Sequence, residues 1–171
     1  MPQHQRRIDR VLGSDYLAGL TDRSLDEVRE MDRDCAEIET ELSYVRRLAQ
    51  ARIDIMQAEL DRRAAGGSLG DLIDALPKIL SDDTARPDPA SSRFTDPASG
   101  ATEIDFKRGL ESLISDATLA NLPTLSDTEI STALQQLAEL ESEVSTTRQA
   151  LHRVMDRLER DLAQRLAVGQ A

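Results

Sequence analysis

Residues 24–63 read SLDEVREMDRDCAEIETELSYVRRLAQARIDIMQAELDRR, with apolar side chains alternately three and four positions apart. Repeated over roughly four heptads, this spacing is typical of the seam of a coiled coil. The stretch opens with Ser24 and Glu27, a Ser-x-x-Glu capping box, and it is followed by Gly66 and Gly67, a C-terminal stop signal. We therefore expect one long helix over residues 24–66.

A second stretch, residues 124–168, repeats the first at an offset of 102 residues. Ser126 and Glu129 open it as Ser24 and Glu27 open the first. The seam repeats in register: Val28, Met31, Cys35, Ile38, Leu42, Val45, Ala49, Arg52 and Met56, then Ile130, Ala133, Leu137, Leu140, Val144, Thr147, Leu151, Val154 and Leu158. Because one chain carries both stretches, we expect them to pair as a helical hairpin, with Arg52 and Thr147 weakening the seam locally.

The rest of the chain predicts short elements. Residues 1–23 are an N-terminal segment with a short helix around Ile8–Leu20, interrupted by Gly13 and Ser14. Short helices are expected over 67–80 and 103–119. Between them, residues 81–102 contain three prolines and several Ser and Asp residues, which predicts a flexible, disordered linker. No segment alternates as a strand would, so the predicted fold class is all-α.

Composition excludes several function classes. A net charge of -11 and four aromatic rings argue against direct contact with nucleic acid. Cys35 is the one cysteine, so neither an internal disulfide nor a cysteine-based metal site is possible, and no apolar run is long enough for a membrane span or a signal peptide. His4 and His152 lack metal-ligand partners at useful spacing. We therefore expect a cytoplasmic protein without a membrane or a metal, and not an enzyme.

Beside the seam runs a row of polar residues that a coiled coil does not require, here called the polar ladder. At about 100° per residue, the five positions in each helix share an arc of roughly 80° and span about 22 Å. The ladder residues are Glu39, Ser43, Arg46, Gln50 and Asp54 in the first helix, and Glu141, Ser145, Arg148, His152 and Asp156 in the second.

Two interpretations of the ladder stay open on spacing alone. Residues three and four apart pair along a helix, so the ladder can be solvated helix support retained after a duplication. Four of the five positions are nevertheless identical, while other exposed positions differ, such as Arg47 and Gln149. Arg and Asp can bind guanine edges, and Arg can bind phosphate. Two matching ladders therefore suit a two-fold symmetric ligand.

The pattern Glu-x3-Ser-x2-Arg-x3-Gln-x3-Asp, present twice, resembles the signature of the RsiG family, the cyclic-di-GMP-dependent anti-sigma factors of sporulating actinobacteria. The first copy matches in full, and the second departs only at His152, where the family has Gln. The resemblance covers both long helices and says little about residues 1–23 or the linker.

The resemblance implies an antiparallel coiled-coil hairpin with short flanking helices. It implies that all ten ladder residues bind a cyclic di-GMP dimer as a regulatory ligand. The loaded protein would then sequester a WhiG-type sporulation sigma factor from RNA polymerase. The alternative is a structural coiled-coil adaptor without nucleotide binding, whose ladder tolerates alanine.

Apolar residues outside the seam allow a further expectation. Leu25, Ile53, Ile55 and Leu60 lie off the seam and, if exposed, offer a protein-facing surface. They can equally pack against the short helices.

Overall fold

The computed structural model describes residues 7–85 and 119–169, and within these ranges every regular element is a helix. The elements are α1 (Arg7–Val11), η1 (Leu20–Asp22), α2 (Leu25–Ala64), α3 (Leu69–Ala85), η3 (Leu122–Thr124) and α6 (Asp127–Gly169). The prediction of an all-α protein is confirmed for this part of the chain. The described residues form two compact units, 7–43 with 145–169 and 44–85 with 119–144.

Both long helices begin with the expected capping boxes. The Ser24 amide donates to the Glu27 carboxylate at 2.7 Å, and the Glu27 amide donates to the Ser24 hydroxyl at 3.2 Å. Ser126 and Glu129 repeat these two contacts at 2.7 and 3.3 Å. Each box satisfies amide groups that have no partner inside the helix.

The end of α2 is set by two glycines. The Gly67 amide donates to the Arg62 carbonyl at 2.9 Å, and the Gly66 amide donates to the Arg63 carbonyl at 3.1 Å. Gly66 has φ of 69°, a left-handed conformation that costs glycine little. The helix therefore ends where the sequence signal places its stop.

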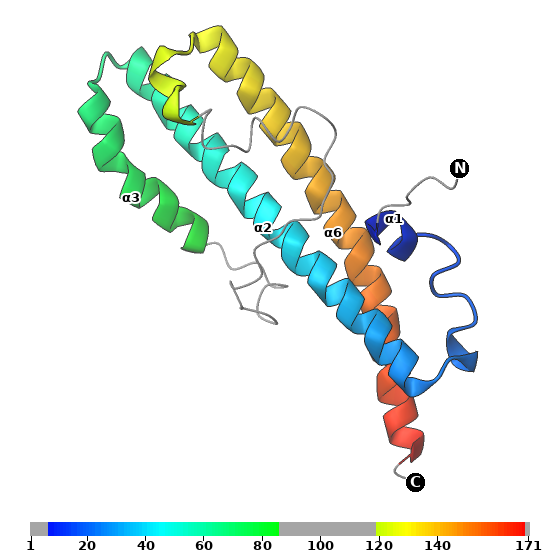
Figure 1. Cartoon of the computed structure of the whole chain (residues 1–171). Helices are drawn as coiled ribbons and strands as arrows, with labels where there is room; N and C mark the ends of the chain where they lie inside the picture. Colours follow the sequence, from blue (N-terminus) through cyan, green and yellow to red (C-terminus); the bar gives the residue numbers. More distant parts are fainter. Residues whose placement is uncertain (1–6, 86–118, 170–171) are drawn as a thin grey trace. The chain divides into compact units, whose positions relative to one another are not determined.

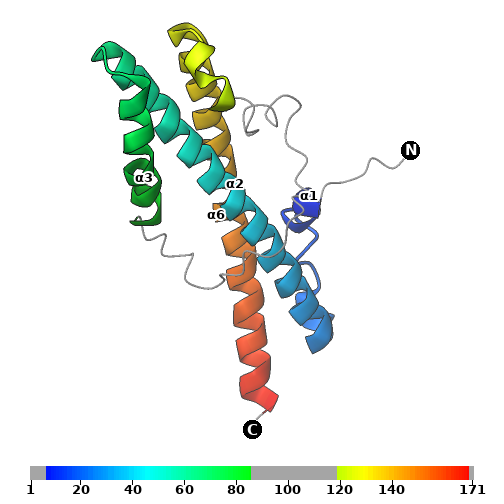
Figure 2. The ribbon, with the colours of Figure 1, turned by 60° about the vertical axis from the view of Figure 1, so that its left-hand side comes forward.

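In the second unit, α3 folds back alongside α2 (Figure 1) and Figure 2 shows the same arrangement from another side. It runs through Pro77 and reaches Ala85, five residues past the predicted end at residue 80 and into the predicted linker. Residues 86–102 of the predicted linker, and residues 103–118 of the helix predicted over 103–119, lie outside the described residues.

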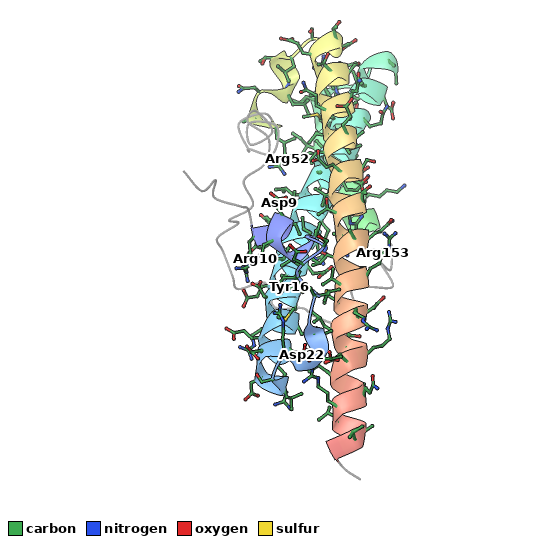
Figure 3. The ribbon with its side chains drawn as sticks, turned by 90° about the vertical axis from the view of Figure 1, so that its right-hand side faces the viewer. Asp9, Arg10, Tyr16, Asp22, Arg52 and Arg153 are labelled. Atoms are coloured by element: carbon green, nitrogen blue, oxygen red, sulfur yellow. The ribbon has the colours of Figure 1, made fainter. Side chains whose placement is uncertain are left out.

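In the first unit, the N-terminal segment is less helical than expected. Instead of a helix over Ile8–Leu20, α1 ends at Val11 and turns lead to η1. Arg7 and Arg10 of α1 form ion pairs with Asp34 of α2. Figure 3 shows Arg10 lying against α2. Because the Val11 side chain is fully buried, both charge and apolar packing hold this segment in place.

The predicted seam forms the core of each unit. In α2 all nine seam positions are buried, including Cys35 at 0% exposure and Arg52 at 4%. In α6 seven of the nine are buried, while Thr147 and Val154 are half-buried. The three-and-four spacing therefore identified the buried faces of both helices, and Cys35 is a buried free thiol as its seam position predicts.

An arginine near the end of each long helix reaches the turn before the other long helix. In the first unit, Arg165 donates to the carbonyls of Leu20 at 2.7 Å and Arg23 at 2.6 Å. In the second unit, Arg63 donates to the carbonyls of Leu122 at 3.0 Å and Leu125 at 2.7 Å. We call Arg63 and Arg165 the end arginines. Each end arginine therefore joins the end of one long helix to the turn before the other within its own unit.

None of the helices in the described ranges combines the length and apolar character that crossing a membrane requires.

Candidate functional site

The ten ladder residues are divided between the two units. The first unit contains Glu39 and Ser43 from α2, with Ser145, Arg148, His152 and Asp156 from α6. The second contains Arg46, Gln50 and Asp54 from α2, with Glu141 from α6. Each unit thus holds residues from both copies of the motif.

In the first unit, three side chains converge on one oxygen of Glu39. Arg148 donates to Glu39 Oε1 from Nη2 at 2.8 Å and from Nε at 3.3 Å. The Ser43 hydroxyl donates to the same oxygen at 2.7 Å, and His152 Nε2 lies 3.5 Å from it. We call Glu39, Ser43, Arg148 and His152 the Glu39 cluster.

The Glu39 cluster is well shielded from solvent. The side chain of Arg148 is 7% exposed and that of Glu39 is 15% exposed. Burial raises the pKa of Glu39, but hydrogen bonds from Arg148 and Ser43 outweigh it and leave that pKa below its ordinary value. Glu39 is therefore a carboxylate at neutral pH and pairs with Arg148 as an ion.

In the second unit, the corresponding pair is looser. Arg46 Nη1 lies 3.8 Å from Glu141 Oε1, and the two side chains are 24% and 26% exposed. Gln50 donates to Asp54 at 2.9 Å along α2. Gln50 thus pairs within its own helix, whereas its counterpart His152 lies beside Glu39 of the other helix.

The remaining ladder residues vary in exposure. Ser145 and Asp54 are half-buried, whereas Asp156 is exposed. The structure therefore brings Glu39, Ser43, Arg148 and His152 into direct contact, and Arg46 close to Glu141.

A second charged cluster, around Glu59, was not predicted from the sequence. Glu59 has 0% exposure and accepts hydrogen bonds from Arg62 at 2.7 and 2.8 Å and from Arg63 at 2.6 Å. The hydrogen bonds from Arg62, followed by those from Arg63, lower the pKa of Glu59 to about 2 despite its burial. Arg63 also binds Asp127 at 2.8 Å, so the cluster joins the end of α2 to the start of α6.

The repeat contained a signal for this second cluster. Arg63 and Arg165 stand 102 residues apart, as do Leu20 and Leu122, which end up 5% and 3% exposed. The repeated unit thus extends beyond the two capping boxes to include η1, η3 and the end arginines.

The off-seam apolar residues Leu25, Ile53, Ile55 and Leu60 are all half-buried. A protein-facing surface and packing against the short helices both stay predictions for them. The large apolar residues that are exposed include Tyr44 at 57% and Ile73 at 58%.

The titratable groups of the described residues include neither a metal-binding group nor a reactive thiol. Among the described residues, no group of three or more His, Cys, Asp or Glu side chains could hold a metal ion. Burial raises the pKa of the Cys35 thiol to about 11, so it is a poor nucleophile at neutral pH. Guanidinium and carboxylate groups remain, and these recognise phosphate groups and guanine edges.

A comparison with protein-family models finds one match to part of the chain. Residues 14–80 match the model of a family described as RsiG-like. The match includes the first motif copy and ends before the second, and it confirms over this range the resemblance predicted from the motif. No curated protein matches the chain.

Proposed function

From the RsiG-like match over residues 14–80, which suggests an anti-sigma factor role, we propose that this protein binds cyclic di-GMP and sequesters a sigma factor when loaded. The sigma factor is of the WhiG type, and its release when the nucleotide level falls switches on sporulation genes. The nucleotide is a regulatory ligand rather than a substrate, and the protein is not an enzyme.

The observation that carries this proposal is the family match combined with the repeated motif. The matched range contains Glu39, Ser43, Arg46, Gln50 and Asp54. The second copy lies on α6 at the same offset, with His152 as its single departure. A two-fold symmetric dinucleotide dimer suits two copies of one motif.

The ladder side chains fit the chemistry of cyclic di-GMP. Arg46 and Arg148 can donate in a fork to a phosphodiester or to guanine O6 and N7, and the carboxylates of Asp54 and Asp156 can accept from guanine N1–H and the 2-amino group. Gln50 and His152 can each add one hydrogen bond. We further propose that α2 and α6 present these groups as an antiparallel coiled-coil hairpin.

The charge of the protein also supports a sigma-factor partner. Sigma factors present basic surfaces to DNA, and a chain with a net charge of -11 is suited to cover such surfaces and to associate with them quickly.

Equilibrium dialysis with labelled cyclic di-GMP tests the proposal, with GTP as the control nucleotide. Wild type should retain cyclic di-GMP and not GTP, and the Arg46→Ala, Arg148→Ala double variant should retain neither. Arg153→Ala is the matched control, since Arg153 is exposed on α6 outside the ladder (Figure 3). Equal retention by wild type and the double variant would leave the coiled-coil adaptor as the better description.

A further inference from the structure

The Glu39 cluster bears on ligand binding, because the ladder residue Arg148 is already bound to a carboxylate. Arg148 directs two nitrogen atoms, Nη2 and Nε, at a single oxygen of Glu39. Any ligand that uses the same guanidinium face must take the place of that carboxylate.

The contact is stronger than a surface ion pair. Both side chains are largely withdrawn from water, at 7% and 15% exposure. A charged hydrogen bond of this kind is about twice as strong as a neutral one, and exposed pairs contribute far less. The Ser43 hydroxyl holds the same Glu39 oxygen at 2.7 Å, which fixes the carboxylate where Arg148 meets it.

The corresponding pair of the other motif copy is farther apart. Arg46 Nη1 lies 3.8 Å from Glu141 Oε1, and each side chain is about one quarter exposed. The difference coincides with His152, which lies 3.5 Å from Glu39, whereas its counterpart Gln50 bonds to Asp54.

We propose that Glu39 is a built-in competitor for Arg148, so that an anionic ligand binds only by displacing the Glu39 carboxylate from the Arg148 guanidinium. This inference rests on the proposed function, because the ligand that it names is cyclic di-GMP. Glu39 sets the nucleotide concentration at which the protein loads.

The test measures cyclic di-GMP affinity by titration calorimetry on the full chain for wild type, Glu39→Gln and Glu30→Gln. Glu39→Gln keeps the side-chain shape and removes the competing charge, so it should bind on the order of five-fold more tightly. Glu30→Gln, at an exposed position of α2 outside the ladder, is the matched control and should stay within about two-fold of wild type. Unchanged or weaker binding by Glu39→Gln would overturn the proposal, and weaker binding would make Glu39 a direct ligand contact.

A ligand-free measurement separates failure of this inference from failure of the proposed function. Hydrogen exchange of the Arg148 Nε–H, followed by NMR, should accelerate several-fold in Glu39→Gln and change little in Glu30→Gln. If no variant binds cyclic di-GMP, the proposed function fails, and this exchange rate alone decides whether Glu39 holds Arg148. An unchanged rate would overturn the competitor role.

A second variant covers the case in which Glu39→Gln does not fold. Glu39→Asp keeps the charge and shortens its reach by one methylene, so it loosens the contact without leaving Arg148 beside a neutral group. It should bind about two-fold more tightly than wild type. Binding weaker than wild type would overturn the proposal.

Discussion

Arg63 and Arg165 stand 102 residues apart and make equivalent contacts, each donating to two carbonyls of the turn before a capping box. Arg63 binds the carbonyls of Leu122 and Leu125, and Arg165 binds those of Leu20 and Arg23. The positions of the four acceptors also differ by 102. The 102-residue repeat therefore includes the contact between the end of each long helix and the turn before the other.

Alanine at either end arginine should destabilise the protein. Arg165→Ala removes two charged hydrogen bonds to backbone carbonyls, and we expect a loss of about 2 kcal/mol in the free energy of unfolding in urea. Arg63→Ala should cost at least as much, because Arg63 also contacts Glu59 and Asp127.

Two controls accompany the end-arginine variants. Arg165→Lys should recover less than half of the loss, since one ammonium cannot repeat the fork geometry. Arg153→Ala, at an exposed position of α6, should change stability by no more than about 0.5 kcal/mol. A loss of no more than about 0.5 kcal/mol for Arg165→Ala would mean that the hydrogen bonds of Arg165 contribute little to the free energy of unfolding.

The buried Glu59 predicts a loss of stability in acid. Its pKa is about 2 in the folded protein against an ordinary 4.5, so its contribution is fully present above pH 4.5. That contribution should be lost as the pH falls from 4.5 through 2. Unfolding measured across this range should become progressively easier for wild type.

Substitution of Glu59 distinguishes its contribution to the acid dependence of stability from the contributions of other carboxylates. Glu59→Gln should cost roughly 3 kcal/mol at pH 7, because it leaves Arg62 and Arg63 without their buried partner, and should flatten the acid dependence. Glu30→Gln, at an exposed position of α2, should leave both the stability and its pH dependence unchanged. An acid profile of Glu59→Gln parallel to that of wild type would contradict this assignment.

Periodicity was a reliable guide to the buried faces of the long helices. Apolar burial is the main stabilising contribution, so a regular seam leaves little choice of face. Even Arg52, an interruption of the seam, is 4% exposed, since its neighbours along the helix are covered. Thr147 and Val154 are half-buried, which periodicity alone does not reveal.

The charged contacts were harder to predict than the core. Spacing along one helix indicates pairs such as Gln50 with Asp54, which are four residues apart. It does not indicate that Arg148 contacts Glu39 at a separation of 109 residues, because that contact depends on how the two helices align. The repeat identified Glu39 and Arg148 as ladder residues but did not predict the contact between them.

His152→Gln restores the residue that the RsiG signature has at this position, and it should leave cyclic di-GMP affinity within about ten-fold of wild type. One neutral hydrogen bond contributes roughly 1 kcal/mol net, whether imidazole or amide provides it. Titration calorimetry at pH 7 measures the change. A larger effect would mean that His152 does more than replace one amide contact, through its proximity to Glu39 at 3.5 Å.

Capture of a WhiG-type sigma factor should depend on added nucleotide. In a pull-down with the tagged full chain, we expect capture with cyclic di-GMP present and little without it, because in the proposed function only the loaded protein sequesters the sigma factor. The Arg46→Ala, Arg148→Ala double variant should capture little sigma factor even with nucleotide, whereas Arg153→Ala should behave as wild type. Capture that ignores the nucleotide would keep the anti-sigma role and remove the switch. Absence of capture under both conditions would contradict the role itself.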